Sequence, residues 1–184
     1  LNKLGIKTKL IAGPSNIVFS KLLNTKKIIS AKEMMAEVKK SLPVDIAVCA
    51  AAVSDFKPIN KKKNKIKKSE IKSKKISLEK NDDILDYLSK NNKVRPKIVV
   101  GFSAETENVI LNSKLKIKEK YCDLIIANDV SKKETGFNSD YNKVSIIDKK
   151  GQVKSIPKNK KSFVASVIAK IILGKILIND KNIN

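Results

Sequence analysis

Residues 97–108 read KIVVGFSAETEN, an apolar run that ends in a cluster of small and polar residues. The same pattern occurs in residues 45–56, DIAVCAAAVSDF, and in residues 124–130, LIIANDV. Because apolar residues follow one another without polar alternation, each run is typical of a strand buried on both faces of a parallel sheet. The ends of such strands gather at the edge where open α/β sheets bind ligands. The sequence therefore predicts an α/β fold in which the ends of all three runs, 51–55, 101–108 and 128–129, face one crevice.

Strands and helices are expected to alternate along the rest of the chain. The signals are capping residues, turn residues and hydrophobic periodicity. They predict strands at 8–12, 27–30 and 76–78, helices from Ser30 to before Pro43, from Asn81 or Asp82, at about 107–121 and at 163–177, and a hairpin at 143–156.

The composition points to one domain and an anionic partner. The chain has 184 residues, 41% of them hydrophobic, which suffices for one sizeable core. Its formal net charge is +22, and residues 57–75 are especially rich in lysine and are expected to form a loop or extended arm. Many of these lysines are expected to be solvated surface residues, whereas clustered ones suit a polyphosphate or a nucleic acid. The two cysteines, Cys49 and Cys122, lie in or beside apolar strands, which fits a reducing compartment without disulfides.

The most apolar helix, at 163–177, is interrupted by Lys170, Gly174 and Lys175. Because a membrane span needs about 20 apolar residues, we expect this helix to dock on the core. We also expect the sequence to carry no signal peptide. The predicted buried stripe of the helix consists of Phe163, Val167, Ile168, Ile171 and Ile172.

Several kinds of catalysis are excluded by the residues. The chain has no histidine, which removes an imidazole base and any His-ligated zinc site, so a metal would be of the Mg²⁺ kind. It has neither a GxGxxG fingerprint after a strand nor a P-loop. A phosphate group would instead be held by lysines in 65–68, by Lys116 and Lys120 on one helical face, and by the helix start at 82–85.

Six motifs follow one another along the chain. They are AAVSDF at 51–56, KIKK at 65–68, GFSAETEN at 101–108, the pair Lys116 and Lys120, AND at 127–129, and GFNSDYN at 136–142. This order resembles the phosphopantothenoylcysteine synthetases, also called phosphopantothenate-cysteine ligases, from about Thr8 to the final helix.

The resemblance implies a fold and a reaction. The fold would be Rossmann-like, a mainly parallel sheet with helices on both faces, a C-terminal hairpin and a lysine-rich arm. The reaction would join 4′-phosphopantothenate to L-cysteine in coenzyme A biosynthesis, using CTP and Mg²⁺ and passing through an acyl cytidylate. The resemblance further implies a cytoplasmic homodimer that binds neither nucleic acid nor membrane. FMN would belong only to a possible decarboxylase domain upstream of Leu1.

The resemblance also implies roles for individual residues. Lys65 would be catalytic by neutralising phosphate charge, on a flexible flap at 57–75. The nucleotide would be contacted by Ala51, Asp55, Lys65, Asp82, Asp83, Ile84, Leu85, Phe102, Lys116 and Lys120. Weaker candidates, for positioning the flap or the acyl substrate, are Asn128, Asp129 and Asn138, and no metal ligand is assigned. The simpler alternatives are a solvated Lys65, a turn or helix cap at Asp55, and core packing of Phe102.

The sequence departs from the family pattern in two places. Residues 81–83 read Asn-Asp-Asp where the family has Asn-Pro-Asp. The family's GGT strand end and its N-x-SSGKMG-like loop do not occur, and an element ahead of Leu1 is expected to supply them. We therefore expect the 184 residues alone to bind CTP poorly and to form no amide.

Two other functions compete with the ligase. A basic nucleic-acid-binding module would explain the net charge of +22, but aromatic residues make up only 4% of the chain and offer few stacking platforms. A nicotinamide-dependent reductase would need the glycine fingerprint and a Tyr-x-x-x-Lys pair, which the sequence lacks.

Overall fold

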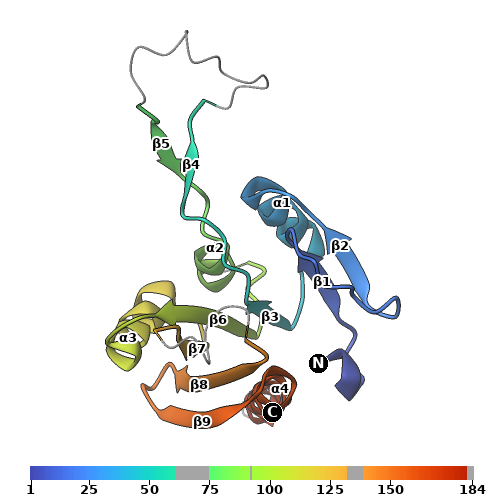
Figure 1. Ribbon diagram of the computed structural model, residues 1–184. Coiled ribbons are helices and arrows are strands. Elements are labelled where there is room, and N and C mark those ends of the chain that lie inside the picture. Colours follow the sequence, from blue (N-terminus) through green and yellow to red (C-terminus); the bar gives the residue numbers. More distant parts are fainter. Residues whose placement is uncertain (61–74, 92, 132–138, 182–184) are drawn as a thin grey trace.

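The computed structural model describes residues 1–60, 75–91, 93–131 and 139–181 (Figure 1). Five strands form one mixed sheet in the order β3-β6-β7-β8-β9. Their bounds are β3 Ile46–Cys49, β6 Ile98–Glu105, β7 Leu124–Asp129, β8 Tyr141–Asp148 and β9 Val153–Lys160. The first three strands run parallel, and β8 and β9 add an antiparallel hairpin, as predicted.

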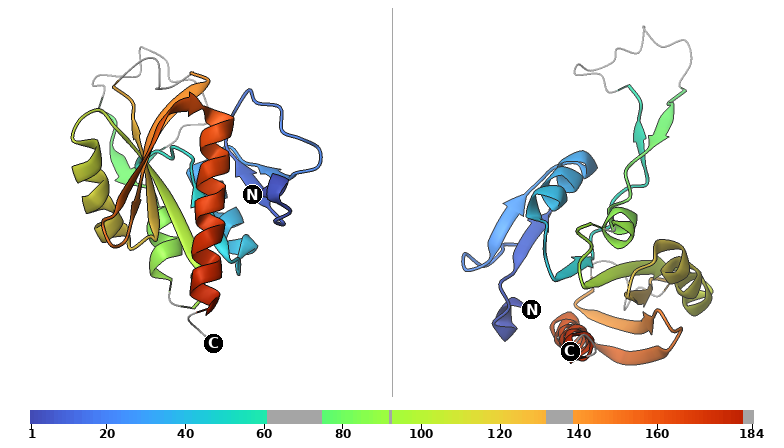
Figure 2. Two further views of the ribbon diagram at one scale, coloured as in Figure 1. Left: turned by 90° about the horizontal axis from the view of Figure 1, so that it is seen from below. Right: turned by 180° about the vertical axis from the view of Figure 1, so that it is seen from behind.

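Helices cover both faces of this sheet, which confirms the predicted Rossmann-like α/β class (Figure 2). The helices are α1 Ala31–Ser41, α2 Ile84–Lys90, α3 Val109–Lys120 and α4 Lys161–Lys181, and a single 3₁₀ turn, η1 Asn2–Leu4, lies near the N-terminus. α2 and α3 pack on one face through Leu85, Leu88 and Ile117, and α4 packs on the other. None of the helices in the described ranges is long and apolar enough to cross a membrane.

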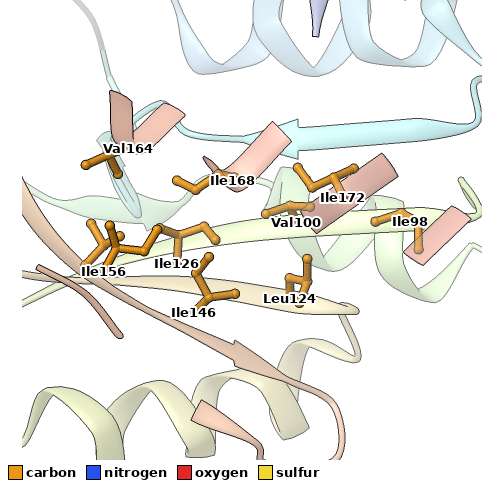
Figure 3. Packing of buried hydrophobic residues seen from close by; sticks show 10 residues of the cluster. Ile98, Val100, Leu124, Ile126, Ile146, Ile156, Val164, Ile168 and Ile172 are labelled. Atoms are coloured by element: carbon orange, nitrogen blue, oxygen red, sulfur yellow. The ribbon is translucent and has the colours of Figure 1, made fainter. Parts of the chain in front are cut away.

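The α4 face holds the larger hydrophobic cluster (Figure 3). α4 contributes Val164, Ile168 and Ile172, which recur at intervals of four residues and meet the aliphatic side chains of β6, β7 and β8. The predicted stripe is therefore correct at Ile168 and Ile172 and wrong at Phe163, which is 49% exposed. Its other two members, Val167 and Ile171, pack partly buried against the same cluster. Val164 takes the buried position because it lies four residues before Ile168 and so shares a helix face with Ile168 and Ile172, whereas Phe163 does not.

Burial on both faces is confirmed for β6 and β7 but not for β3. Residues 98–101 and 124–127 are buried, whereas Val48 in β3 is 40% exposed. β3 differs because it lies at the end of the five-stranded sheet and, among the strands that the structure describes, pairs with β6 alone. An apolar run identifies a strand, but its place in the sheet decides how much of it is buried.

The first two strands form a separate parallel pair, β1 Lys9–Ala12 and β2 Asn24–Lys27. The strand predicted at 27–30 is thus three residues too late. The chain has already turned towards α1 there: Ser30 Oγ accepts a hydrogen bond from the Glu33 N–H (3.3 Å), and the Glu33 carboxylate accepts one from the Ile29 N–H (2.8 Å). These contacts confirm the predicted capping box, with Ile29 N–H in the place of the Ser30 N–H.

A two-stranded antiparallel ribbon projects from the body (Figures 1 and 2). It consists of β4 Phe56–Pro58 and β5 Leu78–Lys80, with Phe56 opposite Lys80. The predicted strand at 76–78 is therefore displaced by two residues. The ribbon flanks the lysine-rich stretch, of which the structure describes residues 57–60 and 75.

Candidate functional site

The segment that leaves β3, where the sequence predicts a crevice, lies against the start of α2. Residues 50–55 connect β3 to the ribbon, and Ala51 and Asp55 are exposed. Asn81 fastens this segment to the start of α2: its Nδ2 donates to the Ser54 carbonyl (2.8 Å) and its backbone N–H to the Asp55 carbonyl (2.8 Å). Asn81 was considered from the sequence only as a helix cap. Its actual role depends on a contact across 27 residues that no local pattern indicates.

The start of α2 is capped by Asp83 rather than by Asn81 or Asp82. The Asp83 carboxylate accepts a hydrogen bond from the Asp86 N–H at 2.9 Å. Asp82 is exposed. Leu85 is buried against Gly101: a Cβ atom added to Gly101 would lie 2.7 Å from Leu85 Cδ2. A ligand at this helix start would therefore meet backbone and carboxylate groups rather than the apolar side chain of Leu85.

The two predicted lysines of α3 contact β6 and the start of α2. Lys116 Nζ donates to the carbonyl of Phe102 on β6 (3.3 Å), and Lys120 Nζ lies 3.1 Å from Asp83 Oδ2. The Phe102 ring is partly buried against the α4-face cluster, so it packs with the core while its carbonyl faces Lys116. The structure thus brings together four predicted site residues: Asp83, Phe102, Lys116 and Lys120.

Lys120 is surrounded by carboxylates. Besides Asp83, it lies 3.1 Å from Glu119 and 3.9 Å from Asp86. Burial acts to raise the pKa of Asp83, but the Asp86 N–H and Lys120 outweigh it, and the pKa lies below its ordinary value. Burial likewise acts to lower the pKa of Lys120, but Asp83 and Glu119 raise it overall. These carboxylates relieve the repulsion expected between Lys116 and Lys120, and an incoming anion has to compete with them.

Polar residues also close β7 at the same edge of the sheet. Asn128 and Asp129 pair in register with Ala104 and Glu105 of β6. Asp129 Oδ1 accepts hydrogen bonds from the Ser131 N–H (3.0 Å) and hydroxyl (2.6 Å). The Asn128 Oδ1 atom is buried without a hydrogen-bond partner in the described part of the chain. The remaining predicted residues, Lys65 and Asn138, lie outside the described residues.

The two cysteines are free thiols unsuited to nucleophilic catalysis. Burial raises the pKa of Cys49 to about 12 and that of Cys122 to about 11. Because the thiolate is the reactive form, both groups are inert near neutral pH. The site thus offers charge and positioning rather than a covalent nucleophile.

A hollow of about 680 Å³ lies in the loop between β1 and β2. It is lined by residues 15–21 and by Leu23, Thr25, Lys26 and Lys27. None of the predicted site residues belongs to its lining.

Comparisons with known proteins agree with one another. The family model described as the DNA/pantothenate metabolism flavoprotein C-terminal domain matches residues 1–176. Proteins named coenzyme A biosynthesis bifunctional protein CoaBC are similar to this chain. The one from Borreliella burgdorferi is 41% identical over 172 residues, 92% of this chain and 43% of the relative. The one from Haemophilus influenzae is 38% identical over 173 residues, 92% of this chain and 42% of the relative. The chain thus spans less than half the length of these curated relatives.

The fold comparison points the same way. A crystal structure of the C-terminal domain of a coenzyme A biosynthesis bifunctional protein CoaBC superposes with a TM-score of 0.76 at 29% identity, over 97% of this chain and 78% of the other.

Proposed function

Because the chain belongs to the DNA/pantothenate metabolism flavoprotein C-terminal domain family, we propose that it is a phosphopantothenate-cysteine ligase domain that uses CTP. The 4′-phosphopantothenate carboxylate attacks the α-phosphorus of CTP, and pyrophosphate leaves with the electrons of the broken P–O bond. The cysteine amine then attacks the acyl carbon of the mixed anhydride. CMP departs, the amine loses a proton, and the amide of 4′-phosphopantothenoylcysteine remains.

The observation that carries this proposal is the meeting of the α3 lysine face with the start of α2. Lys116 reaches the Phe102 carbonyl and Lys120 reaches Asp83 at the start of α2. Asn81 fastens Ser54 and Asp55 to the same helix start. A triphosphate and a phosphorylated acid bring several negative charges into one crevice. Fixed ammonium groups and helix N–H groups stabilise such charge without moving during the reaction. The site therefore suits phosphate chemistry that depends on positioning more than on proton transfer.

Lys116 is the better placed of the two lysines to bind a phosphate. Lys116 Nζ donates a long hydrogen bond of 3.3 Å to the neutral Phe102 carbonyl. Lys120 Nζ, in contrast, already has three carboxylates within 3.9 Å. We propose that Lys116 binds the triphosphate directly. Lys120 contributes charge while it holds α2 and α3 together. Lys65 remains the proposed catalytic lysine on the flap at 57–75, and Ala51 and Asp55 remain proposed nucleotide contacts.

We propose that Mg²⁺ binds together with the nucleotide and not to the protein alone. Mg²⁺ in enzymes of this kind is bound by one or two carboxylates together with substrate phosphates. Within the described residues there is no group of three or more histidine, cysteine or acidic side chains that could hold a metal ion. No step of the proposal therefore depends on a metal held by the protein alone.

The proposal includes a homodimer in the cytoplasm. The ribbon supports self-association, because Phe56, Ile59, Ile76 and Leu78 on or beside it are each more than half exposed. The two free thiols are compatible with a reducing compartment. Gel filtration of a variant lacking residues 57–80 tests the dimer: it is expected to elute as a monomer, and an unchanged elution volume would exclude the ribbon from the interface.

Kinetics of the full-length protein that contains these residues test the ligase reaction. CMP should form from CTP only when 4′-phosphopantothenate and cysteine are both present. Lys116→Met should lower kcat/KM for CTP about 100-fold, as expected for the loss of one fixed donor to phosphate. The matched control is Lys118→Met on an exposed part of the same helix, which should change kcat/KM less than twofold. Equal effects of the two substitutions would refute the assigned role of Lys116. Duplex DNA binding without any CTP-dependent reaction would favour the nucleic-acid alternative.

A further inference from the structure

The backbone around Asp55 is held at three consecutive carbonyl groups. The Ser54 carbonyl accepts a hydrogen bond from Asn81 Nδ2, and the Asp55 carbonyl accepts one from the Asn81 N–H, both at 2.8 Å. The Phe56 carbonyl accepts one from the Ser54 hydroxyl, also at 2.8 Å. Residues 50–55 belong to no helix or strand, so the path of the chain depends on these bonds. Asn81 alone supplies the donors for Ser54 and Asp55.

Asn81 is in turn held by its position beside α2. It follows Lys80, the last residue of β5, and only Asp82 separates it from Asp83, the N-cap of α2 (Figure 1). The Asp83 carboxylate accepts a hydrogen bond from the Asp86 N–H at 2.9 Å and lies 3.1 Å from Lys120 Nζ. Contacts therefore connect α3 through the start of α2 to residues 54–56.

The side chain of Asp55, in contrast with its backbone, is free to meet a ligand. Asp55 is exposed, and its carboxylate has no hydrogen bond or ion pair within the part of the chain that the structure describes. A group whose backbone is fixed before binding loses less conformational entropy when a ligand arrives. A fixed backbone with a free carboxylate is the arrangement expected of a preorganised contact.

The two bonds from Asn81 fix the direction of this carboxylate. The Ser54 carbonyl belongs to the peptide plane that leads into Asp55, and the Asp55 carbonyl belongs to the plane that leaves it. Because each peptide unit is planar, the orientation of the two planes determines φ and ψ of Asp55 and hence the direction of its Cα–Cβ bond. Asn81 holds both planes from one side.

We propose that Asn81 is a positioning residue, which orients the Asp55 carboxylate towards the nucleotide. It acts through Asp55 and touches no reacting atom. Asp83 already caps α2, so the Asn81 side chain is not needed as the cap. The orientation of Asp55 follows from the contacts, whereas its use in binding CTP rests on the proposed function.

A double-mutant cycle on the full-length protein tests this role, with the Kd for CTP measured by isothermal titration calorimetry. Asn81→Ala should raise the Kd about fivefold, as expected for the effect of one hydrogen bond, and Asp55→Ala should raise it about tenfold. The double variant should bind CTP no more weakly than Asp55→Ala alone, because no carboxylate is left to orient. Additive effects would show that Asn81 acts independently of Asp55 and would overturn the proposal. So would an unchanged Kd in Asn81→Ala.

Asn91→Ala is the matched control at the other end of α2. The Asn91 Oδ1 atom accepts hydrogen bonds from the Lys93 N–H (3.2 Å) and the Val94 N–H (3.4 Å), so it also fixes a short segment beside the helix. This variant should change the Kd for CTP less than twofold. An effect equal to that of Asn81→Ala would indicate a general response to loosening α2 and would contradict the assigned role.

Amide hydrogen exchange tests the backbone contacts without any nucleotide. Asn81→Ala should lower the protection of the amide at residue 81 at least about fivefold, because the segment that accepts its hydrogen bond is no longer held at Ser54. The Ile59 amide, which donates to the Ser77 carbonyl further along the ribbon, should keep its protection. Unchanged protection at residue 81 would overturn the proposal, and lost protection at Ile59 would show that Asn81 supports the whole ribbon instead.

The two measurements separate this inference from the proposed function. Wild-type protein that bound no CTP would refute the proposed function and the use of Asp55 in binding CTP. The exchange data would still decide whether Asn81 holds the backbone on both sides of Asp55. CTP binding that is weakened by Asp55→Ala but not by Asn81→Ala would refute the positioning role alone.

Discussion

Replacing Asp123 with alanine is expected to destabilise the fold by about 4 kcal/mol. Asp123 is 7% exposed, and its Oδ2 accepts hydrogen bonds from the Val99 N–H (2.8 Å) and from Arg95 Nη2 (2.9 Å). A hydrogen bond to a charged group contributes about 1.5–3 kcal/mol, and removing one partner of a buried ion pair costs about 3–5 kcal/mol. Alanine removes both bonds and leaves the Val99 N–H without its acceptor.

Arg95 retains other hydrogen bonds in the Asp123→Ala variant, and these limit the loss of stability. Arg95 also donates to the carbonyls of Ser89, Pro96 and Tyr121, at 2.8, 2.9 and 3.1 Å. It therefore continues to connect the end of α2, the start of β6 and the end of α3. Asp123→Asn keeps one acceptor oxygen and should cost about 2 kcal/mol, half of the alanine value.

Urea unfolding followed by far-UV circular dichroism measures these differences. For a chain of this size, 4 kcal/mol corresponds to a Tm lower by about 8–16 °C. Asp45→Ala is the matched control, because Asp45 and Lys97 form an exposed ion pair at 3.6 Å whose loss should cost less than about 1 kcal/mol. If Asp123→Ala destabilised the protein no more than Asp45→Ala, the role assigned to the buried carboxylate would be refuted.

Two further predictions concern α2 and its surroundings. Gly101→Ala should lower the free energy of unfolding by about 1–3 kcal/mol, because the new Cβ would lie 2.7 Å from the buried Leu85 Cδ2. Gly174→Ala in α4, where nothing lies within 4 Å, should instead raise it by up to about 1 kcal/mol, and urea unfolding that ranked the two alike would contradict the packing argument. The pKa of Asp83 lies below its ordinary value of 3.8 in the folded protein, so its ion pair with Lys120 stabilises the fold above that pH and is lost as the pH falls through the folded pKa. Asp83→Asn should therefore destabilise the protein at pH 7 but not in strong acid, and a difference that did not vary with pH would count against the pair.

Local signals in the sequence predicted much of the fold. Ser30 and Glu33 marked the start of α1, because capping contacts involve residues three or four apart. The apolar runs at 98–101 and 124–127 marked β6 and β7, which lie inside the sheet and are buried on both faces. The turn at 149–152 marked the hairpin of β8 and β9.

The errors have non-local causes. Ile28 and Ile29 shifted the second strand because apolar pairs resemble strand residues, although here one is buried beside β1 and the other is exposed. Val48 belongs to an apolar run, but the run does not reveal that β3 ends the sheet. At the site, the lysine pair of α3 could be predicted from its spacing, whereas the carboxylates around Lys120 and the tether from Asn81 come from other elements.

A crystal structure of the full-length protein with CTP tests the central claim most directly. The account predicts triphosphate oxygens within hydrogen-bonding distance of Lys116 Nζ, in the crevice between the start of α2, α3 and the segment 51–55. A nucleotide bound on another face, with Lys116 still directed only at the Phe102 carbonyl, would contradict it.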